Sequence, residues 1–417
     1  MSLSLDDPAN RVAVSPRLVV PALGLTQILA WGSSFYLPAV LAQPVASDTG
    51  WSLTWVVGGL SIGLLIAGLT SPFVGRQIHR YGGRPVLAAS SILLSAGLFG
   101  LALAPNLAVF VLCWVVLGFG MSAGLYDAAF STLGHLFGRA ARHHIAVLTL
   151  FGGLASTVCW PLSAYMVTEL GWRGACAVYA VIQIALCLPL HLLVLPKTAA
   201  RTANRDEIDI APVDAQRDKS AAMSFRSSPV FLLLAVTITI GSTVSTVVSV
   251  HLLTILQAQG IALAAAVALG ALIGPAQVGA RFIEILVGRY HHPIWTKIAS
   301  VTLVALGLGL LWSGAPIVFL ALIFYGAGIG LESIARATLP LELYGSRDYA
   351  LIVGKIARPS LIAQAAAPSI GAFLIETLGA QESLAAIVLL AGANVLLAAI
   401  LFGITRSPPK QGIVPRF

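Results

Sequence analysis

Long apolar stretches alternate with short polar turns along this chain. Each stretch is about as long as the roughly 20 residues that an α-helix needs to cross a bilayer. The turns between them contain Gly, Pro or charged residues, which end helices. Twelve spans follow, at residues 18–43, 53–75, 84–104, 107–135, 143–168, 174–196, 228–257, 262–288, 294–312, 315–344, 350–377 and 383–405. The pattern predicts an all-α integral membrane protein with twelve transmembrane helices.

One polar segment in the middle of the chain breaks this rhythm. Residues 197–226 hold six Lys or Arg and five Asp or Glu among Ala, Ser and Thr, without apolar periodicity. Such a composition is typical of a flexible linker. We predict five regions: a tail at 1–17, a six-helix lobe at 18–196, a cytoplasmic linker at 197–227, a second six-helix lobe at 228–405 and a tail at 406–417.

The two predicted lobes resemble each other at a constant offset of 207 residues. Leu-Phe-Gly ends the fourth span at Gly138, and Leu-Tyr-Gly ends the tenth at Gly345. Pro161 follows the first glycine by 23 residues, and Pro368 follows the second by the same 23. Two parallel six-helix repeats are typical of secondary transporters, which rock one half against the other around a central site.

Composition and charge placement support a membrane protein. The chain is 58% hydrophobic and 10% charged, against about 25% charged residues in soluble domains. Successive polar segments lie on alternate sides of the membrane. The segments on the side of the amino terminus, with the adjoining span ends, hold all but four of the 24 Lys and Arg. Because positive loops stay in the cytoplasm, we predict a multi-pass protein of the cytoplasmic (inner) membrane with both termini in the cytoplasm. The net charge of +8 then sets orientation and requires no nucleic-acid partner.

The turn between the second and third spans carries a family resemblance. Its sequence GRQIHRYGGR, residues 75–84, resembles the signature G-x-x-x-D-R-x-G-R-K of the major facilitator superfamily, and Gly-Trp-Arg at 171–173 is also common there. The resemblance implies two pseudo-symmetric six-helix lobes, alternating access and a gating loop. The loop residues carried over are Gly75, His79, Arg80, Gly82 and Arg84.

This chain departs from the family pattern at three places. His79 replaces the aspartate of the signature, and Trp114 stands where the fourth span often has arginine. In the fifth span, Trp160 and Pro161 interrupt the glycine-rich pattern of drug/proton antiporters. The resemblance therefore supports the superfamily and leaves the branch open, with monocarboxylate-type carriers and exporters of drugs or metalloids as candidates.

Charged residues inside the predicted spans indicate a functional cavity. A charge at a helix centre costs about 2.5–3.5 kcal/mol, so it normally faces protein or water. Carboxylates exchange protons where burial and nearby cations change their proton affinity, and the candidates for proton coupling are Asp127, Glu284 and Glu332. Arginines and aromatic rings suit a polar or anionic substrate. The candidates for substrate binding are Arg281, Arg336, Arg358, Gln277, Trp31, Gln27, Tyr36 and Tyr325.

Several readings of these charges stay open. Arg281 with Glu284, and Glu332 with Arg336, are spaced to form ion pairs within one helix, which would give them a structural role only. The leading hypothesis is proton-coupled efflux of a small solute. The alternatives are uptake of a small organic anion, metalloid export, and a non-transporting membrane sensor. We expect a monomer with a small-molecule substrate, protons and the bilayer as partners, and no cofactor, bound metal, nucleic acid or enzymatic activity.

Overall fold

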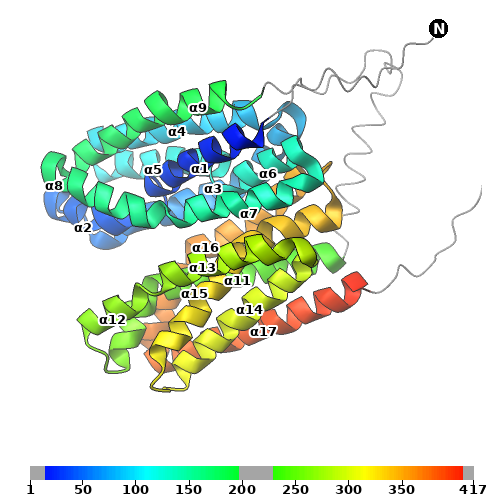
Figure 1. The fold of residues 1–417 in the computed structure, drawn as a ribbon. Coiled ribbons are helices and arrows are strands. Elements are labelled where there is room, and N and C mark those ends of the chain that lie inside the picture. Colours follow the sequence, from blue (N-terminus) through cyan, green and yellow to red (C-terminus); the bar gives the residue numbers. More distant parts are fainter. Residues whose placement is uncertain (1–14, 197–228, 407–417) are drawn as a thin grey trace, which may run out of the picture. The chain divides into compact units, whose positions relative to one another are not determined.

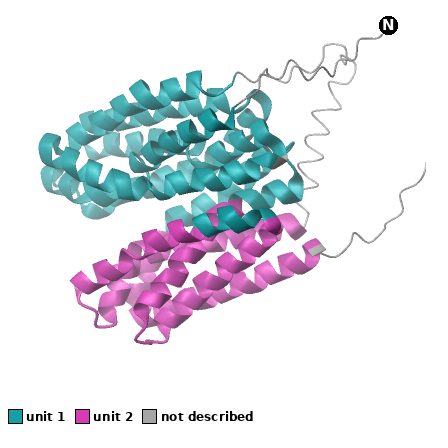
Figure 2. Cartoon of the chain, in the orientation of Figure 1, with its two compact units in different colours: residues 1–202, 281–289, 337–366 teal, residues 203–280, 290–336, 367–417 magenta. Residues whose placement is uncertain are grey.

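The computed structural model describes residues 15–196 and 229–406, so the predicted linker and most of both predicted tails lie outside the described residues. Every regular element in these two ranges is a helix. The chain divides into two compact units, which are treated separately below (Figures 1 and 2). Unit 1 comprises residues 1–202, 281–289 and 337–366, and unit 2 comprises residues 203–280, 290–336 and 367–417.

Unit 1 contains all helices of the first predicted lobe. They are α1 (Pro16–Gly32), α2 (Pro38–Thr49), α3 (Leu53–Tyr81), α4 (Gly83–Leu103), α5 (Leu107–Gly124), α6 (Tyr126–Phe137), α7 (Ala141–Gly153), α8 (Ala155–Ile182), the π-helical turn η3 (Gln183–Cys187) and α9 (Leu188–Leu193). Close glycine contacts bring α3 and α5 together: a Cβ on Gly118 would lie 2.6 Å from the Gly63 carbonyl oxygen. Trp114 fills the space beside Gly59 and Gly63, so it is a packing residue of this interface.

Unit 2 is built mainly from the second predicted lobe. Its helices come from α11 (Pro229–Ala258), α12 (Leu263–Gly270), α13 (Ile273–Val287), α14 (Pro293–Trp312), α15 (Val318–Tyr344), α16 (Tyr349–Leu378) and α17 (Ala380–Arg406). Small residues again set the packing distance. A Cβ on Gly307 of α14 would lie 2.6 Å from the Tyr325 backbone nitrogen of α15, so the two helices contact each other through backbone.

The predicted spans all fall on helices, although their boundaries differ. Among the described residues, ten helical runs are long and apolar enough to cross a membrane. One of them, Ala141–Leu193, has 53 residues. It contains the fifth predicted span and most of the sixth, and the two meet at a kink where Gly171 has φ 70°. The first predicted span is absent from the ten because it consists of the two shorter helices α1 and α2.

The first predicted span breaks at residues 33–37, which the apolar pattern did not reveal. The backbone N–H of Tyr36 bonds to the Trp31 carbonyl oxygen at 3.0 Å, five residues earlier, so the α-helical spacing is lost. Ser33 accepts a hydrogen bond from the Gln183 side chain of η3 at 2.9 Å. Pro38 then begins α2, because proline is tolerated in a first helical turn. Polar side chains therefore hold this break in place.

The expected gating loop is almost entirely helical, which corrects the prediction of a loop at residues 75–84. Helix α3 continues through His79 and Arg80, ends at Tyr81, and α4 begins at Gly83. Only Gly82, with φ 78°, turns the chain, because glycine adopts positive φ without steric cost. His79 and Arg80 lie in the last helical turn, where cations interact favourably with the helix dipole.

The internal repeat predicted from the sequence is visible in the backbone. Gly138 follows the end of α6 with φ 56°, and Gly345 follows the end of α15 with φ 73°. Pro161 lies within α8, and the described helix α16 contains Pro368. The residues that match at an offset of 207 thus occupy equivalent places in the secondary structure.

Segments from the second half of the sequence pack inside unit 1. The hydroxyl of Ser71 on α3 donates to the Gly354 carbonyl oxygen of α16 at 2.9 Å. A Cβ on Gly75, the first residue of the signature, would overlap the Ala350 carbonyl oxygen. The signature glycine is therefore required by a backbone contact between α3 and the first half of α16.

Candidate functional site

Arg281 is a buried cation in unit 1. Its residue is 4% exposed, and its Nη1 donates to the Thr149 carbonyl oxygen at 3.0 Å. The hydroxyl of Tyr126 donates to the same oxygen at 3.3 Å. Thr149 lies near the C-terminal end of α7, whose partial negative charge favours a guanidinium. The helix end therefore holds Arg281 and Tyr126 side by side.

Tyr126, the neighbour of this cation, belongs to a group of packed aromatic rings. The ring of Trp31 lies 5.0 Å from that of Tyr126 and 6.0 Å from that of Tyr36, and Tyr36 meets Trp160 edge-on at 6.1 Å. Of these rings, Tyr126 is tied to Arg281 by the shared Thr149 carbonyl oxygen. We call the rings of Trp31, Tyr36, Tyr126 and Trp160 the aromatic cluster.

Two predicted substrate-binding residues of α1 have buried polar atoms next to this cluster. Gln27 is fully buried, and its Nε2 donates to the Gly124 carbonyl oxygen at 2.6 Å. Gly124 is the last residue of α5, so its carbonyl has no intrahelical partner. Within the described ranges, Gln27 Oε1 and Trp31 Nε1 are buried without a hydrogen-bond partner. Such atoms in a native protein call for a ligand or water.

Asp127 and Glu284, two of the predicted coupling residues, also belong to unit 1. Asp127 is half-buried in the first turn of α6, where a carboxylate interacts favourably with the helix dipole. Glu284 is buried, and its Oε1 lies 3.9 Å from Nη2 of Arg142 on α7. The charge of Glu342 on α15 also acts on Arg142. Arg142 was missed because the predicted fifth span begins at residue 143, so Arg142 fell in a predicted polar turn and resembled an ordinary cytoplasmic cation, whereas the structure places it in α7.

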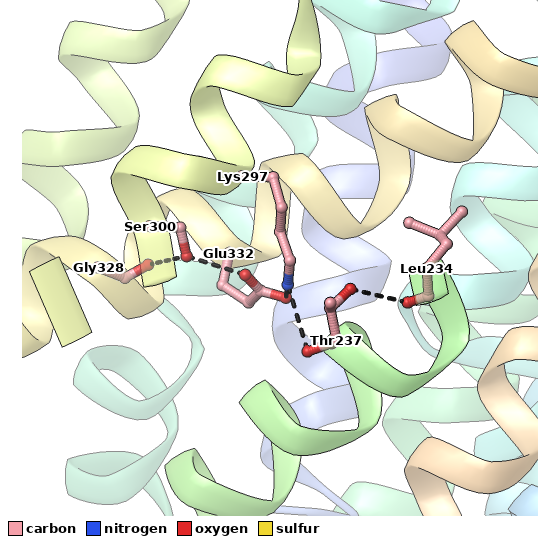
Figure 3. Close-up of polar contacts among 6 residues, drawn as sticks. All are labelled: Leu234, Thr237, Lys297, Ser300, Gly328 and Glu332. Atoms are coloured by element: carbon pink, nitrogen blue, oxygen red, sulfur yellow. Dashed lines mark hydrogen bonds and ion pairs between the residues drawn. The ribbon is translucent and has the colours of Figure 1, made fainter. Parts of the chain in front are cut away.

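Glu332, the third predicted coupling residue, forms a buried ion pair in unit 2 (Figure 3). Its Oε1 accepts a hydrogen bond from Lys297 Nζ of α14 at 2.5 Å, and its Oε2 accepts one from Ser300 at 2.8 Å. The side chain of Lys297 is 1% exposed and that of Glu332 15% exposed. Lys297 also donates to the Thr237 carbonyl oxygen of α11 at 3.4 Å.

The position of Lys297 differs from the sequence expectation. We expected a cytoplasmic cation at the end of a span, and the lysine instead lies buried between helices. Lys297 and Ser300 are three residues apart, so they share one face of α14, and this spacing is the sequence signal that identifies them. The carboxylate of Glu332 also lies near Gly241 of α11, and the side-chain amide of Asn394 on α17 lies near the same glycine. Four helices thus converge on one buried charge pair.

The remaining predicted substrate-binding residues differ in how exposed they are to solvent. Arg336 and Gln277 are half-buried, and Arg358 is exposed. Tyr325 is 1% exposed and packs in the apolar core of unit 2, with its hydroxyl 3.4 Å from the Ser245 carbonyl oxygen. The sequence pattern predicted that Tyr325 forms a wall of the substrate site. The structure instead places it in the apolar core of unit 2.

Two helical repeats, buried charges at mid-helix and multiple apolar spans define a membrane-spanning secondary transporter. The family model described as Major Facilitator Superfamily matches residues 23–357, and the chain belongs to this superfamily. The fold agrees with solved structures. The proton:xylose symporter XylE superposes with a TM-score of 0.72 at 13% identity, covering 94% of this chain and 96% of that one. The human organic anion transporter MFSD10 gives 0.70 at 17% identity, covering 92% and 99%.

Curated relatives match over parts of the chain. The transcription regulatory protein OpdE of Pseudomonas aeruginosa is 28% identical over 144 residues, which are 34% of this chain and 36% of that protein. Monocarboxylate transporter 11 of Mus musculus is 28% identical over 168 residues, or 38% and 35%. The MFS antiporter QDR3 of Candida albicans is 29% identical over 182 residues, or 43% and 25%. The alignments thus span little more than a third of these relatives at most.

Proposed function

We propose that this protein transports a small organic anion across the cytoplasmic membrane by alternating access, coupled to protons. The observation that carries the proposal is the buried guanidinium of Arg281 beside the aromatic cluster. A guanidinium matches the geometry of a carboxylate with two parallel hydrogen bonds. Aromatic rings supply the apolar contact that a small organic acid needs for the rest of its surface.

The names of two similar proteins point in the same direction. One relative is named a monocarboxylate transporter, and one protein of the same fold is titled an organic anion transporter. These names describe those proteins, and they favour an anion here because this chain has its own buried arginine at the candidate site. Metalloid export has less support, since all four cysteines are buried and a thiolate site needs accessible sulfur.

Proton coupling is the second part of the proposal, and carboxylates with changing surroundings are its basis. Asp127 lies beside Tyr126 in the helix that contributes to the Arg281 site, which makes it the first candidate. Glu332 is the second, because protonation of its carboxylate would weaken the attraction to Lys297 and free that buried ammonium to move. Such a change of charge would shift the balance between two conformations that differ in this contact.

The two possible directions of transport move charge differently. Export in exchange for protons, the expectation from the sequence, would carry net positive charge inward, and the negative-inside membrane potential would drive it. Entry of an anion together with one proton would be electrically neutral. The two modes therefore differ in their response to membrane potential at a fixed pH gradient. We retain export as the proposed direction, with both termini in the cytoplasm.

Flux into proteoliposomes tests the substrate class and the coupling. Purified protein would be given lactate, benzoate, a cationic dye and arsenite, with the pH gradient and the potential set independently. We expect carboxylate flux that a pH gradient accelerates. Movement of the dye or arsenite without carboxylate flux would contradict the anion assignment.

The Asp127→Asn variant tests the coupling residue. It should lose the gradient-driven flux and keep exchange of labelled for unlabelled anion at equal pH, because exchange requires binding and no net proton movement. Glu169→Gln, a change at an exposed acid of α8, is the matched control and should keep both. Full gradient-driven flux in Asp127→Asn would remove Asp127 from the coupling role.

A further inference from the structure

A groove of about 490 Å³ lies on unit 1 between α2 and α8. Its volume falls within the range of roughly 300–1,000 Å³ that small-molecule sites occupy. It is lined by Ala39, Val40, Ser156, Thr157, Trp160, Pro161 and Ala164. Most of these side chains are apolar, and two hydroxyl groups give the groove a limited polar edge. The groove thus has the size and chemistry of a site for the apolar part of a ligand.

The sequence explains why a groove forms here. The antiporter-type glycine pattern of the fifth span is replaced by Trp160 and Pro161, so bulky groups hold the neighbouring helix away. Proline also lacks a backbone N–H, and the Thr157 carbonyl four residues earlier loses its usual helical donor. On the other side, the break after α1 lets α2 start in a new direction at Pro38. One wall therefore begins at a break between helices, and the other contains a proline that leaves a helical carbonyl without its usual donor.

The groove is continuous with the Arg281 site through shared aromatic rings. Trp160 lines the groove and is 46% exposed. Its ring meets Tyr36 edge-on at 6.1 Å. The Tyr36 ring lies 6.0 Å from that of Trp31, which lies 5.0 Å from that of Tyr126. The Tyr126 hydroxyl donates to the same Thr149 carbonyl oxygen as Arg281. The aromatic cluster therefore joins the buried cation at one end to the open apolar groove at the other. This connection to a buried charge distinguishes the groove from an ordinary hollow on a helix surface.

We propose that the groove binds the apolar part of the same organic anion whose carboxylate binds Arg281. This inference rests on the proposed function and narrows it: the protein prefers an amphipathic carboxylate with an aryl or bulky alkyl group over a compact acid such as acetate. A hydroxyl or amide donor on that group would find an acceptor in the Thr157 carbonyl oxygen. The groove is thus the specificity-determining part of the site.

Substitutions that fill the groove test this inference. Ala164→Phe places a ring in the groove from α8, and Ala39→Leu fills it from α2, so a folding defect in one variant does not decide the result. Val158→Phe is the matched control, because Val158 is 46% exposed on α8 and does not line the groove. The probes are 4-phenylbutyrate and acetate, and binding to the purified full chain is measured by calorimetry.

The filled variants should bind 4-phenylbutyrate about tenfold more weakly than wild type, with acetate changed less than twofold and Val158→Phe like wild type. Equal affinity of all variants for 4-phenylbutyrate, while Arg281→Gln still weakens it, would overturn the groove assignment and leave the proposed function intact. A lipid found on wild type by native mass spectrometry and displaced in Ala164→Phe, with unchanged phenylbutyrate affinity, would also overturn it. If Arg281→Gln leaves carboxylate binding unchanged, both the groove assignment and the proposed function are wrong.

Discussion

The buried pair of Lys297 and Glu332 gives a quantitative prediction about unit 2. Glu332→Gln leaves an ammonium whose side chain is 1% exposed, with the Thr237 carbonyl at 3.4 Å as an acceptor. Removing one partner of a buried pair costs about 3–5 kcal/mol. Lys297→Met leaves a carboxylate that is 15% exposed, accepts from Ser300 and can take up a proton. Its cost should be smaller, about 1–3 kcal/mol.

The double variant distinguishes a real pair from two independent residues. Lys297→Met with Glu332→Gln removes both charges, and replacing a buried pair by uncharged groups is often neutral. We expect the double variant to be less destabilised than Glu332→Gln alone, with a coupling energy of about 2–3 kcal/mol. Unfolding of purified protein in mixed micelles, followed by tryptophan fluorescence, measures these free energies. Glu382→Gln at an exposed acid is the control and should change stability by less than about 0.5 kcal/mol.

Two outcomes would refute this reasoning. If the single variants destabilise equally, the difference in exposure between the two side chains does not govern the cost. If the double variant equals the sum of the single ones, Lys297 and Glu332 do not interact as the 2.5 Å contact implies.

Two further predictions concern contacts inside unit 1. Arg142→Glu should reduce transport because it places two acids together. Adding Glu284→Arg should restore at least half of the flux. A double variant as inactive as the single one would contradict an ion pair between Arg142 and Glu284. Gly75→Ala should destabilise the protein by about 1–3 kcal/mol, because its Cβ overlaps the Ala350 carbonyl oxygen. Thermal unfolding in detergent measures this change. If Gly75→Ala unfolds at the same temperature as wild type, α3 and α16 can move apart without loss of stability and the prediction is wrong.

Apolar length predicted the helices well, because crossing a bilayer constrains each span separately. The repeat was also predictable, since Gly138 and Gly345 mark helix ends by positive φ, which few other residues adopt. These features depend on the local sequence. They required no knowledge of which helices are neighbours.

The partners of the buried charges could not be predicted in this way. Spacing along one helix suggested that Glu332 pairs with Arg336, whereas the structure pairs it with Lys297 on α14. Arg281 also contacts the Thr149 carbonyl of α7, which lies 132 residues away in the sequence. Periodicity indicates which face of a helix is buried, but the neighbour on that face is set by tertiary packing.

The central claim is that Arg281 binds the carboxylate of a transported anion, and equilibrium exchange of labelled benzoate in proteoliposomes tests it most directly. Loss of a hydrogen-bonded charge should make Arg281→Gln bind roughly 10- to 100-fold more weakly, with Arg281→Lys intermediate because it keeps the charge and loses the planar fork. Arg289→Gln, at an exposed arginine just beyond α13, is the control and should exchange like wild type. Wild-type exchange in Arg281→Gln would contradict the account.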